Sequence, residues 1–220
     1  MDKIVIFDMD GVIIDTEPIY MDIDRKIFKS LGAVITPEEQ HSFVGIASNK
    51  KWTTVKNKCN TDLSLEELMF RGKEEKFQHL KTIESLQAID GIELLLKSLK
   101  TLRVKVCMGS SSPRRTIELI LSKLGLIKYF DFIVSGDEVA HGKPNPDIFL
   151  KSSKQFGIDP SKCIVVEDSA NGVIAAKAGG MKCVGFKNEN SGIQDLSMAD
   201  LIIDCFSEEN INKIISFIIK

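Results

Sequence analysis

The chain has 220 residues, of which 43% are hydrophobic and 27% are charged. This length exceeds a typical domain of roughly 100–150 residues but is short for two full-sized domains, which favours one domain carrying a sizeable insertion. The composition excludes intrinsic disorder. The 29 lysines and arginines nearly balance the 31 aspartates and glutamates, and a formal net charge of -2 gives no bulk attraction to nucleic acid or to anionic membranes.

The start of the chain, its apolar runs and its cysteines predict a cytoplasmic protein. The apolar run Ile4–Phe7 is too short for a signal peptide and has the wrong flanks. No stretch approaches the roughly 18 apolar residues of a membrane-spanning helix. The cysteines form no Cys-x-x-Cys pair, and Cys107, Cys163 and Cys183 lie in apolar runs. We therefore expect buried free thiols in a reducing compartment, rather than a redox or zinc site.

Short apolar runs rich in isoleucine and valine alternate with helical patterns along the chain. Because their apolarity is continuous rather than alternating, they are typical of strands buried on both faces. Helices on both sides of a parallel sheet produce such burial, so the predicted fold class is α/β with a doubly wound parallel sheet. The expected strands are Ile4–Phe7, Val104–Met108, Phe132–Val134, Cys163–Val166, Cys183–Phe186 and Leu201–Ile203.

A helical insertion separates the first two expected strands. Far more residues lie between Phe7 and Val104 than one crossover helix needs. We therefore predict an α/β core made of residues 1–15 and 88–220, and an inserted domain of about four helices at residues 16–87.

Local signals support helices in and after this insertion. The segments Thr36–Glu39 and Ser64–Glu67 both have the pattern of a capping box. Trp52 lies in a helical pattern, where we expect it to pack inside the insertion. After the insertion, Asp90 is the expected cap of a helix that leads back to the sheet.

Acidic residues follow two of the expected strands. Asp8 and Asp10 end the first strand, and Glu167 and Asp168 follow the strand that begins at Cys163. Turn formation is the alternative for the first pair, and helix capping by Asp168 or Ser169 is the alternative for the second. Ligands of parallel sheets bind beyond the carboxyl ends of the strands, where the two pairs would converge. Carboxylates about 4 Å apart repel by about 4 kcal/mol at an effective dielectric constant of about 20, so we expect a divalent cation, and all-oxygen ligands favour Mg²⁺.

Hydroxyl groups and one lysine follow two further strands. Ser110, Ser111 and Ser112 precede Pro113, which we place at the first position of a helix, so hydroxyls and free amides gather where an anion can bind. Ser112 could instead serve only as the N-cap. Lys143 stands in a loop before a proline, which keeps it out of helical geometry. A loop lysine is usually solvated, but one held beside an acidic cluster could bind phosphate.

Together these segments resemble the four ordered motifs of the haloacid dehalogenase-like hydrolases. More narrowly, they resemble the branch that contains β-phosphoglucomutase and the small sugar-phosphate phosphatases, whose helical cap is inserted after the first motif. The resemblance covers most of residues 1–15 and 88–220. Its motifs are Asp8–Glu17, Ser110, Gly142–Pro144 and Val166–Ser169.

The resemblance implies a role for each motif residue. Asp8 would attack phosphorus and become a transient aspartyl phosphate. Asp10 would protonate the leaving alkoxide and then deprotonate water. Ser110 and Ser111 would bind the phosphoryl oxygens together with Lys143, which would also offset the charge of the nucleophile. Dehalogenases of the superfamily lack the second aspartate, so Asp10 argues against C–halogen chemistry.

The resemblance also implies a Mg²⁺ site and a substrate class. The ion would be bound by Asp8, the backbone carbonyl of Asp10, Glu167 (directly or through water) and Asp168. We therefore predict a Mg²⁺-dependent phosphatase that hydrolyses small phosphomonoesters, sugar phosphates in particular. Its expected partner is this small-molecule substrate, with no nucleic acid and no membrane, and we expect a monomer.

A β-phosphoglucomutase-type mutase is the alternative function. The mutases keep a histidine where this chain has Tyr20, and an arginine shortly after Gly45, near Ser48. That arginine binds the far phosphate of a bisphosphate, and Lys50 or Lys51 could replace it. Because the arginine is missing, we favour hydrolysis over transfer.

A phosphoacceptor receiver domain is a more remote, non-enzymatic alternative. Receivers combine a doubly wound sheet with an acidic cluster, Mg²⁺, a hydroxyl residue and a lysine. They are about half this length, have no inserted cap, and carry the phosphorylated aspartate on a middle strand. The acidic pair of this chain follows its first strand, which argues against a receiver.

Overall fold

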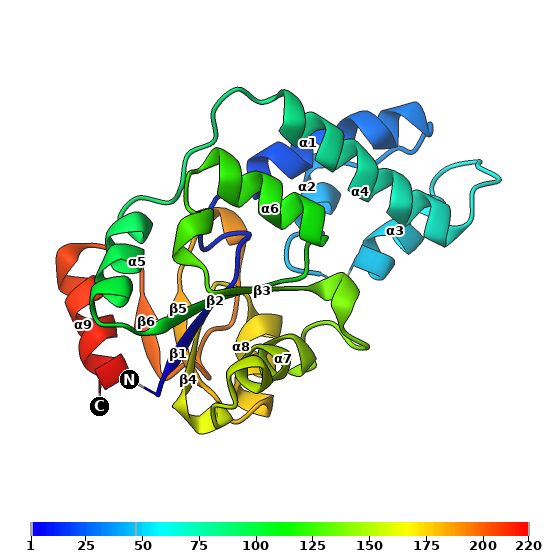
Figure 1. Cartoon of the computed structure of the whole chain (residues 1–220). Helices are drawn as coiled ribbons and strands as arrows, with labels where there is room; N and C mark the ends of the chain where they lie inside the picture. The colour runs from blue at the N-terminus through cyan, green and yellow to red at the C-terminus, as the bar shows by residue number, and fades with distance from the viewer. Residues whose placement is uncertain (1, 47, 220) are drawn as a thin grey trace. The chain divides into compact units, whose positions relative to one another are not determined.

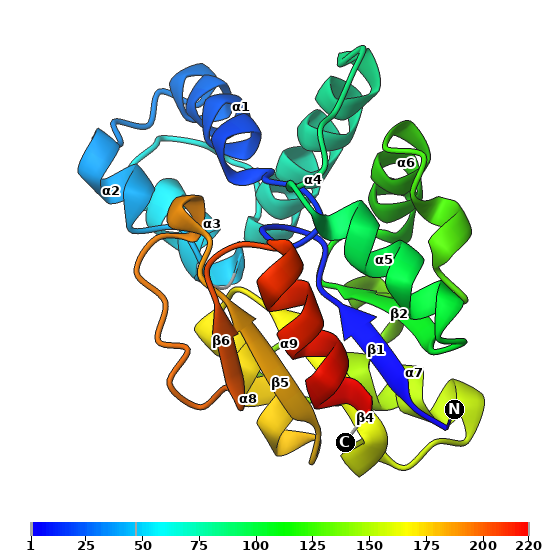
Figure 2. The same cartoon turned by 90° about the vertical axis from the view of Figure 1, so that its left-hand side faces the viewer.

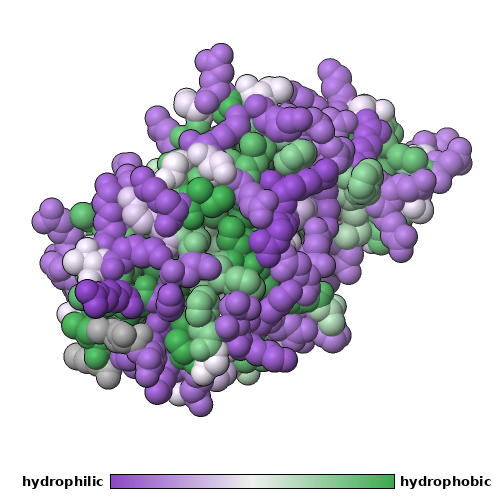
Figure 3. Space-filling view, in the orientation of Figure 1, coloured by the Kyte–Doolittle hydropathy of each residue, from purple (hydrophilic) through white to green (hydrophobic). Residues whose placement is uncertain are grey.

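The computed structural model describes residues 2–46 and 48–219 and shows two compact units (Figure 1). One contains the chain up to Asp15 and again from Ser85 onward, and we call it the sheet unit. The other, Thr16–Glu84, is the helical unit. The face drawn in Figure 3 is mostly hydrophilic, with apolar residues between the polar ones. Among the described residues, no helix has both the length and the apolarity to pass through a membrane.

Six strands, all parallel to their neighbours, form the centre of the sheet unit (Figures 1 and 2). The strand order β3-β2-β1-β4-β5-β6 places β1 in the interior and winds outward from it in both directions, which confirms the predicted doubly wound α/β class. Each expected strand is present. The strands are β1 (Ile4–Phe7), β2 (Lys105–Ser110), β3 (Phe132–Ser135), β4 (Cys163–Glu167), β5 (Lys182–Phe186) and β6 (Leu201–Ile203).

Helices cover both faces of this sheet. Figures 1 and 2 show α7 and α8 on one face, and α5, α6 and α9 on the other. Alternate side chains of a strand point to the same face of the sheet. Ile4 and Ile6 of β1 accordingly belong to one buried cluster with Phe149 of α7 and Val173 of α8, which packs the first face. The helices are α5 (Ile92–Thr101), α6 (Arg114–Lys123), α7 (Asp147–Phe156), α8 (Ala170–Ala178) and α9 (Glu208–Ile219).

The expected cap of α5 was wrong by one residue. The N-cap is Gly91 rather than Asp90, and none of the described side chains caps the helix. Gly91 has a φ of 82°, a left-handed conformation that favours glycine. A Cβ atom at this position would also collide with the carbonyl oxygen of Phe206. A close approach of two backbone segments therefore fixes this helix start, in place of a capping side chain.

The described part of the helical unit contains the four helices α1 (Glu17–Ser30), α2 (Pro37–His41), α3 (Ser48–Lys56) and α4 (Leu65–Thr82). Both predicted capping boxes are confirmed. The hydroxyl of Thr36 accepts from the backbone N–H of Glu39, whose carboxylate accepts from the N–H of Thr36. Ser64 and Glu67 make the same reciprocal pair at the start of α4.

Trp52 packs in the core of the helical unit, as expected. The residue is 2% exposed, and its ring meets the ring of Phe28 edge to face, with centroids 5.9 Å apart. Gly72 of α4 lies directly against it, because a Cβ atom at Gly72 would collide with Trp52 Cζ2. The two helices α3 and α4 thus approach closely at a glycine.

Gly72→Ala is expected to destabilise the helical unit by about 1–2 kcal/mol, because overpacking against Trp52 outweighs the better helix propensity of alanine. Trp52 is the only tryptophan of the chain, so its fluorescence during urea unfolding reports on this unit. Phe70→Ala, on the same helix and 66% exposed, is the control and should leave the transition in place. Unchanged or increased stability of Gly72→Ala would contradict the packing described.

Candidate active site

Three buried carboxylates meet at the carboxyl ends of two neighbouring strands. β1 and β4 pair in register, and the N–H of Asp8 extends this pairing by donating to the carbonyl of Val166 at 3.0 Å. Asp8 therefore lies beside Glu167, the last residue of β4, and Asp168. One oxygen from each of these three side chains lies within 4.8 Å of the others. The predicted convergence of the two acidic strand ends is thus present.

Lys143 joins this carboxylate cluster from a loop. Its Nζ donates to Asp8 Oδ1 at 2.7 Å and to Glu167 Oε1 at 2.6 Å. The lysine side chain is only 7% exposed, so it is not a solvated loop lysine. The same Nζ lies 5.0 Å from the centre of the Phe149 ring. The ammonium group is therefore fixed between the strand ends by charge and by an aromatic face.

Burial and neighbouring charges shift the pKa of Asp8, Asp168 and Lys143. Burial raises the pKa of Asp8 to about 7, against the opposing effect of Lys143 and with added repulsion from Glu167 and Asp10. Burial also raises the pKa of Asp168, helped by Glu167 and Asp8. For Lys143, burial lowers the pKa, but the two carboxylates outweigh it and raise the pKa above its usual range. Three carboxylates thus share one ammonium group.

These residues fit a divalent cation of the Mg²⁺ type. Asp8, Glu167 and Asp168 offer only oxygen ligands, which such ions prefer, and are at most 8% exposed. With one ammonium group for three carboxylates, the cluster is short of positive charge. A dication would offset both the burial and the repulsion between carboxylates that raise the pKa of Asp8 and Asp168.

Glu167 is held on both of its oxygens. While Oε1 accepts from Lys143, Oε2 accepts from the backbone N–H of Ser169 at 2.8 Å and from its hydroxyl at 2.9 Å. The hydroxyl of Ser169 also accepts from the N–H of Gly172, so Ser169 is the N-cap of α8. The sequence offered capping by Asp168 or Ser169 as an alternative to a site. Ser169 caps the helix, and Asp168 joins the cluster.

Two serines at and after the end of β2 contact the side chain of Asp10. Ser112 Oγ donates to Asp10 Oδ2 at 2.9 Å, and the fully buried Ser110 Oγ lies 3.4 Å from the same oxygen. Ser111 is exposed. Pro113 is the N-cap of α6 and not its first residue, and no side chain caps this helix. The hydroxyl of Ser112 is therefore oriented toward Asp10 and does not cap α6.

One residue of the site was missed by the sequence analysis. Ser191, from a loop after β5, donates its hydroxyl to Asp168 Oδ2. The sequence held a weak signal for its position. A polar segment that follows a buried parallel strand begins at the same edge of the sheet as Asp8 and Asp168. No motif marks it, and serine is common in loops, so nothing singled it out.

Lys51, one of the two lysines considered as a replacement for the mutase arginine, is already paired within the helical unit. Its Nζ donates to Asp24 Oδ2 at 2.7 Å, and Lys76 Nζ lies 3.3 Å from the same oxygen. Burial and the charge of Lys76 lower the pKa of Lys51 to about 8. Lys76 also lies over the ring of Tyr20, 4.4 Å from its centre. Lys50 is exposed.

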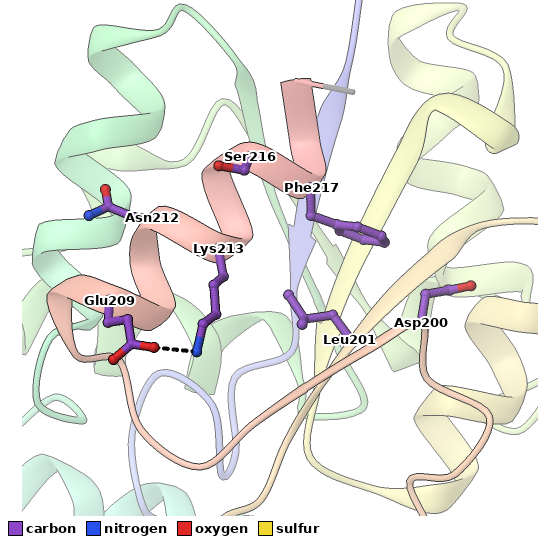
Figure 4. Close-up of a pocket in the computed structure, with 7 residues that line it drawn as sticks. All are labelled: Asp200, Leu201, Glu209, Asn212, Lys213, Ser216 and Phe217. Carbon is purple, nitrogen blue, oxygen red and sulfur yellow. Dashed lines mark ion pairs between the residues drawn. The ribbon is translucent and has the colours of Figure 1, made fainter.

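A pocket of about 490 Å³ lies elsewhere in the sheet unit, against α9 and the start of β6 (Figure 4). It is lined by Asp200, Leu201, Glu209, Asn212, Lys213, Ser216 and Phe217, and Lys213 and Glu209 form an ion pair of 2.7 Å there. Asp200 and Leu201 lie at the amino end of a strand, whereas Asp8 and Asp168 follow carboxyl ends. Since parallel sheets bind ligands at the carboxyl ends, the carboxylate cluster is the candidate site.

Comparison with known proteins agrees with this geometry. A family model described as haloacid dehalogenase-like hydrolase matches residues 5–186, which include every residue of the cluster. The chain belongs to this family. The family resemblance seen in the sequence motifs is thus confirmed, and with it the hydrolase class.

The similarity to individual relatives covers most of this hydrolase. The phosphorylated carbohydrates phosphatase of Thermotoga maritima is 36% identical over 81% of this chain and 82% of its own length. The fructose-1-phosphate phosphatase YqaB of Escherichia coli is 32% identical over 82% of this chain and 94% of its own. Among solved structures, β-phosphoglucomutase from Clostridium difficile superposes with a TM-score of 0.80 and 29% identity over 100% of both chains.

Proposed function

We propose that this hydrolase is a Mg²⁺-dependent phosphatase that releases phosphate from small phosphomonoesters, sugar phosphates in particular, through an aspartyl-phosphate intermediate. The observation that carries the proposal is the buried carboxylate of Asp8, held by Lys143 beside Glu167 and Asp168, with Asp10 two residues further on. The names of two relatives, a phosphorylated carbohydrates phosphatase and a fructose-1-phosphate phosphatase, support the substrate class.

The first step is attack by Asp8. One of its carboxylate oxygens bonds to phosphorus while the bond from phosphorus to the ester oxygen breaks, and the leaving alkoxide takes a proton from Asp10. The ammonium group of Lys143, 2.7 Å from Asp8 Oδ1, reduces the repulsion between the nucleophile and the phosphate. Ser112 orients the carboxyl group of Asp10 through its hydrogen bond to Oδ2.

The second step returns the enzyme to its starting state. Asp10, now a carboxylate, accepts a proton from a water molecule whose oxygen bonds to phosphorus. The bond between Asp8 and phosphorus breaks, which releases inorganic phosphate and regenerates the free carboxylate. One aspartate thus carries the phosphoryl group and the other carries the proton, so two easier displacements replace one difficult displacement.

Binding of the phosphoryl group is assigned to residues around the same strand ends. Ser110 ends β2 and Ser111 follows it, close to the start of α6, where backbone N–H groups favour anions. Asp8, Glu167, Asp168 and the backbone carbonyl of Asp10 would bind Mg²⁺. When bound, the ion supplies positive charge that stabilises the phosphoryl oxygens in the transition state.

Turnover is expected to require a divalent cation, because the buried carboxylates repel one another without it. EDTA should remove the activity, and Mg²⁺ or Mn²⁺ should restore it. Calcium should bind but support turnover poorly, since its looser coordination misplaces the nucleophile. Phosphate release from p-nitrophenyl phosphate measures this, and full activity in excess chelator would exclude the proposed ion site.

A mutase is the second candidate function, favoured by the likeness to β-phosphoglucomutase from C. difficile. Against it, Tyr20 and Ser48 stand where the mutases keep a histidine and an arginine, and Lys51 is already paired with Asp24. We therefore expect hydrolysis without a bisphosphate activator.

The test is incubation with β-glucose 1-phosphate, with and without a trace of β-glucose 1,6-bisphosphate. Phosphate should be released at the same rate in both. Formation of glucose 6-phosphate much faster than phosphate release would overturn the phosphatase assignment. A parallel screen of phosphorylated metabolites, read by released phosphate, tests the substrate class.

A further inference from the structure

Ser191 stands out among the buried polar residues because it contacts a residue of the carboxylate cluster and lies outside all four motifs. It ends the short 3-10 helix η4 (Glu189–Ser191), after β5, and is 9% exposed. Its hydroxyl donates to Oδ2 of Asp168, which is itself 6% exposed. A buried serine hydroxyl is thus directed at one oxygen of a proposed cation ligand.

The loop that carries Ser191, residues 188–194, is held by hydrogen bonds of its own backbone and side chains. The N–H of Ser191 donates to the carbonyl of Asn188 at 3.2 Å, and Gln194 Nε2 donates to the carbonyl of Ser191 at 2.8 Å. Gln194 Oε1 accepts from the N–H of Ala170, the first residue of α8, at 3.0 Å. Both backbone polar groups of Ser191 are therefore held, which fixes the backbone from which its hydroxyl reaches Asp168.

The same loop is also tied to the turn that follows β1. Asn188 Nδ2 donates to the carbonyl oxygen of Gly11 at 2.9 Å. Gly11 has a φ of 80°, and a Cβ atom there would collide with Asp168 Oδ2 and come within 2.9 Å of Ser191 Oγ. The glycine backbone and the serine hydroxyl thus enclose Oδ2 together. We therefore expect Oδ1 to be the oxygen of Asp168 that binds a cation.

We propose that Ser191 is a positioning residue for the cation site: its hydroxyl occupies Asp168 Oδ2, so that the carboxylate offers a single oxygen, Oδ1, in a fixed direction. The inference rests on the proposed divalent-cation site but assigns a role to a loop that lies outside the four motifs. One oxygen per carboxylate suits Mg²⁺, which requires near-octahedral geometry and keeps several waters. Hydrogen bonds to ligating carboxylates usually contribute 10-fold to 100-fold in metal affinity.

Metal binding to the substrate-free protein tests this directly. Chelator-treated full-length protein is titrated with Mg²⁺, and with Mn²⁺ as a tighter probe, by isothermal titration calorimetry. Ser191→Ala should weaken binding by about 10-fold, whereas Ser191→Thr, which keeps the hydroxyl, should bind within about 2-fold of the wild type. The Mg²⁺ concentration that gives half-maximal phosphate release should rise by the same factor in Ser191→Ala.

Two further variants separate positioning from a general loss of structure. Ser197→Ala changes an exposed serine that follows the same loop and should bind cations as the wild type does. Gln194→Ala removes the side chain that holds the backbone of Ser191 without touching Asp168, and should weaken binding less than Ser191→Ala does. Thermal unfolding of each metal-free variant shows whether it folds. If Ser191→Ala does not fold, the cation affinity of Gln194→Ala tests the proposal instead.

The outcomes are distinct. Equal affinities in the wild type, Ser191→Ala and Gln194→Ala would overturn the positioning role and leave the proposed phosphatase intact. No cation binding by the wild type would overturn the cation site itself and the role of Ser191 with it. Loss of affinity in Ser191→Thr as large as in Ser191→Ala would show that the hydroxyl is not what matters.

Discussion

Replacing Asp8 with asparagine is expected to lower kcat by at least about 10⁴-fold. Losses of this size are typical when the nucleophile is removed from a set of catalytic residues that act together. The amide cannot form the aspartyl phosphate, although it keeps the size and position of the side chain. The fold should tolerate the change, because Asp8 belongs to a cluster in which three carboxylates share one ammonium group. Phosphate release from p-nitrophenyl phosphate at saturating Mg²⁺ measures the effect.

The matched control for Asp8→Asn is Asp195→Asn, the same substitution at an exposed position of the sheet unit. It should retain the activity of the wild type. If Asp8→Asn turned over substrate at more than a few per cent of the wild-type rate, covalent catalysis by this residue would be wrong, and direct attack by water would have to replace it.

Lys143→Met is expected to lower kcat/KM by about 10³-fold, the scale for loss of one group that stabilises charge in the transition state. The lysine contacts both Asp8 and Glu167 at hydrogen-bond distance while almost fully buried, so the variant leaves the three carboxylates of the cluster without this ammonium group. Removing one partner of a buried ion pair typically costs about 3–5 kcal/mol. We therefore expect reduced stability as well as reduced turnover.

Lys154→Met, on the exposed surface of α7, is the control for Lys143→Met and should change neither quantity. Stability is measured by urea unfolding followed by circular dichroism, since Trp52 lies in the other unit. If Lys143→Met turned over substrate at the wild-type rate, the lysine would have no part in the mechanism. Unchanged stability would contradict its role as the counterion of the carboxylate cluster.

The sheet and its acidic edge were predictable because their signals are local. Continuous apolar runs such as Ile4–Phe7 identify strands covered on both faces, and the residues directly after them share one edge whatever connects the strands. Asp8 and Asp168 could therefore be placed together from their positions alone. The order of the motifs then indicated the family, and the resemblance to that family predicted that Lys143, a loop residue, would lie at the site, where it contacts Asp8 and Glu167.

Contacts between residues that no pattern connects could not be predicted. Ser191 reaches Asp168 across 23 positions, through a loop whose conformation depends on Asn188 and Gln194. The pairing of Lys51 with Asp24 likewise joins two helices 27 positions apart. At Gly91, the approach of the Phe206 backbone decided the helix start over the capping preference of Asp90. Tertiary packing settled each of these details.

Trapping of the phosphoryl group tests covalent catalysis by Asp8 most directly. Asp10→Asn should form the aspartyl phosphate from p-nitrophenyl phosphate, whose leaving group needs little acid assistance, and should break it down slowly. After an acid quench and proteolysis, mass spectrometry should find one phosphoryl group on the peptide that contains Asp8, placed on that residue by fragmentation. The double variant with Asp8→Asn should carry none. Steady phosphate release with no phosphorylated peptide, or a phosphoryl group on another residue, would contradict the account.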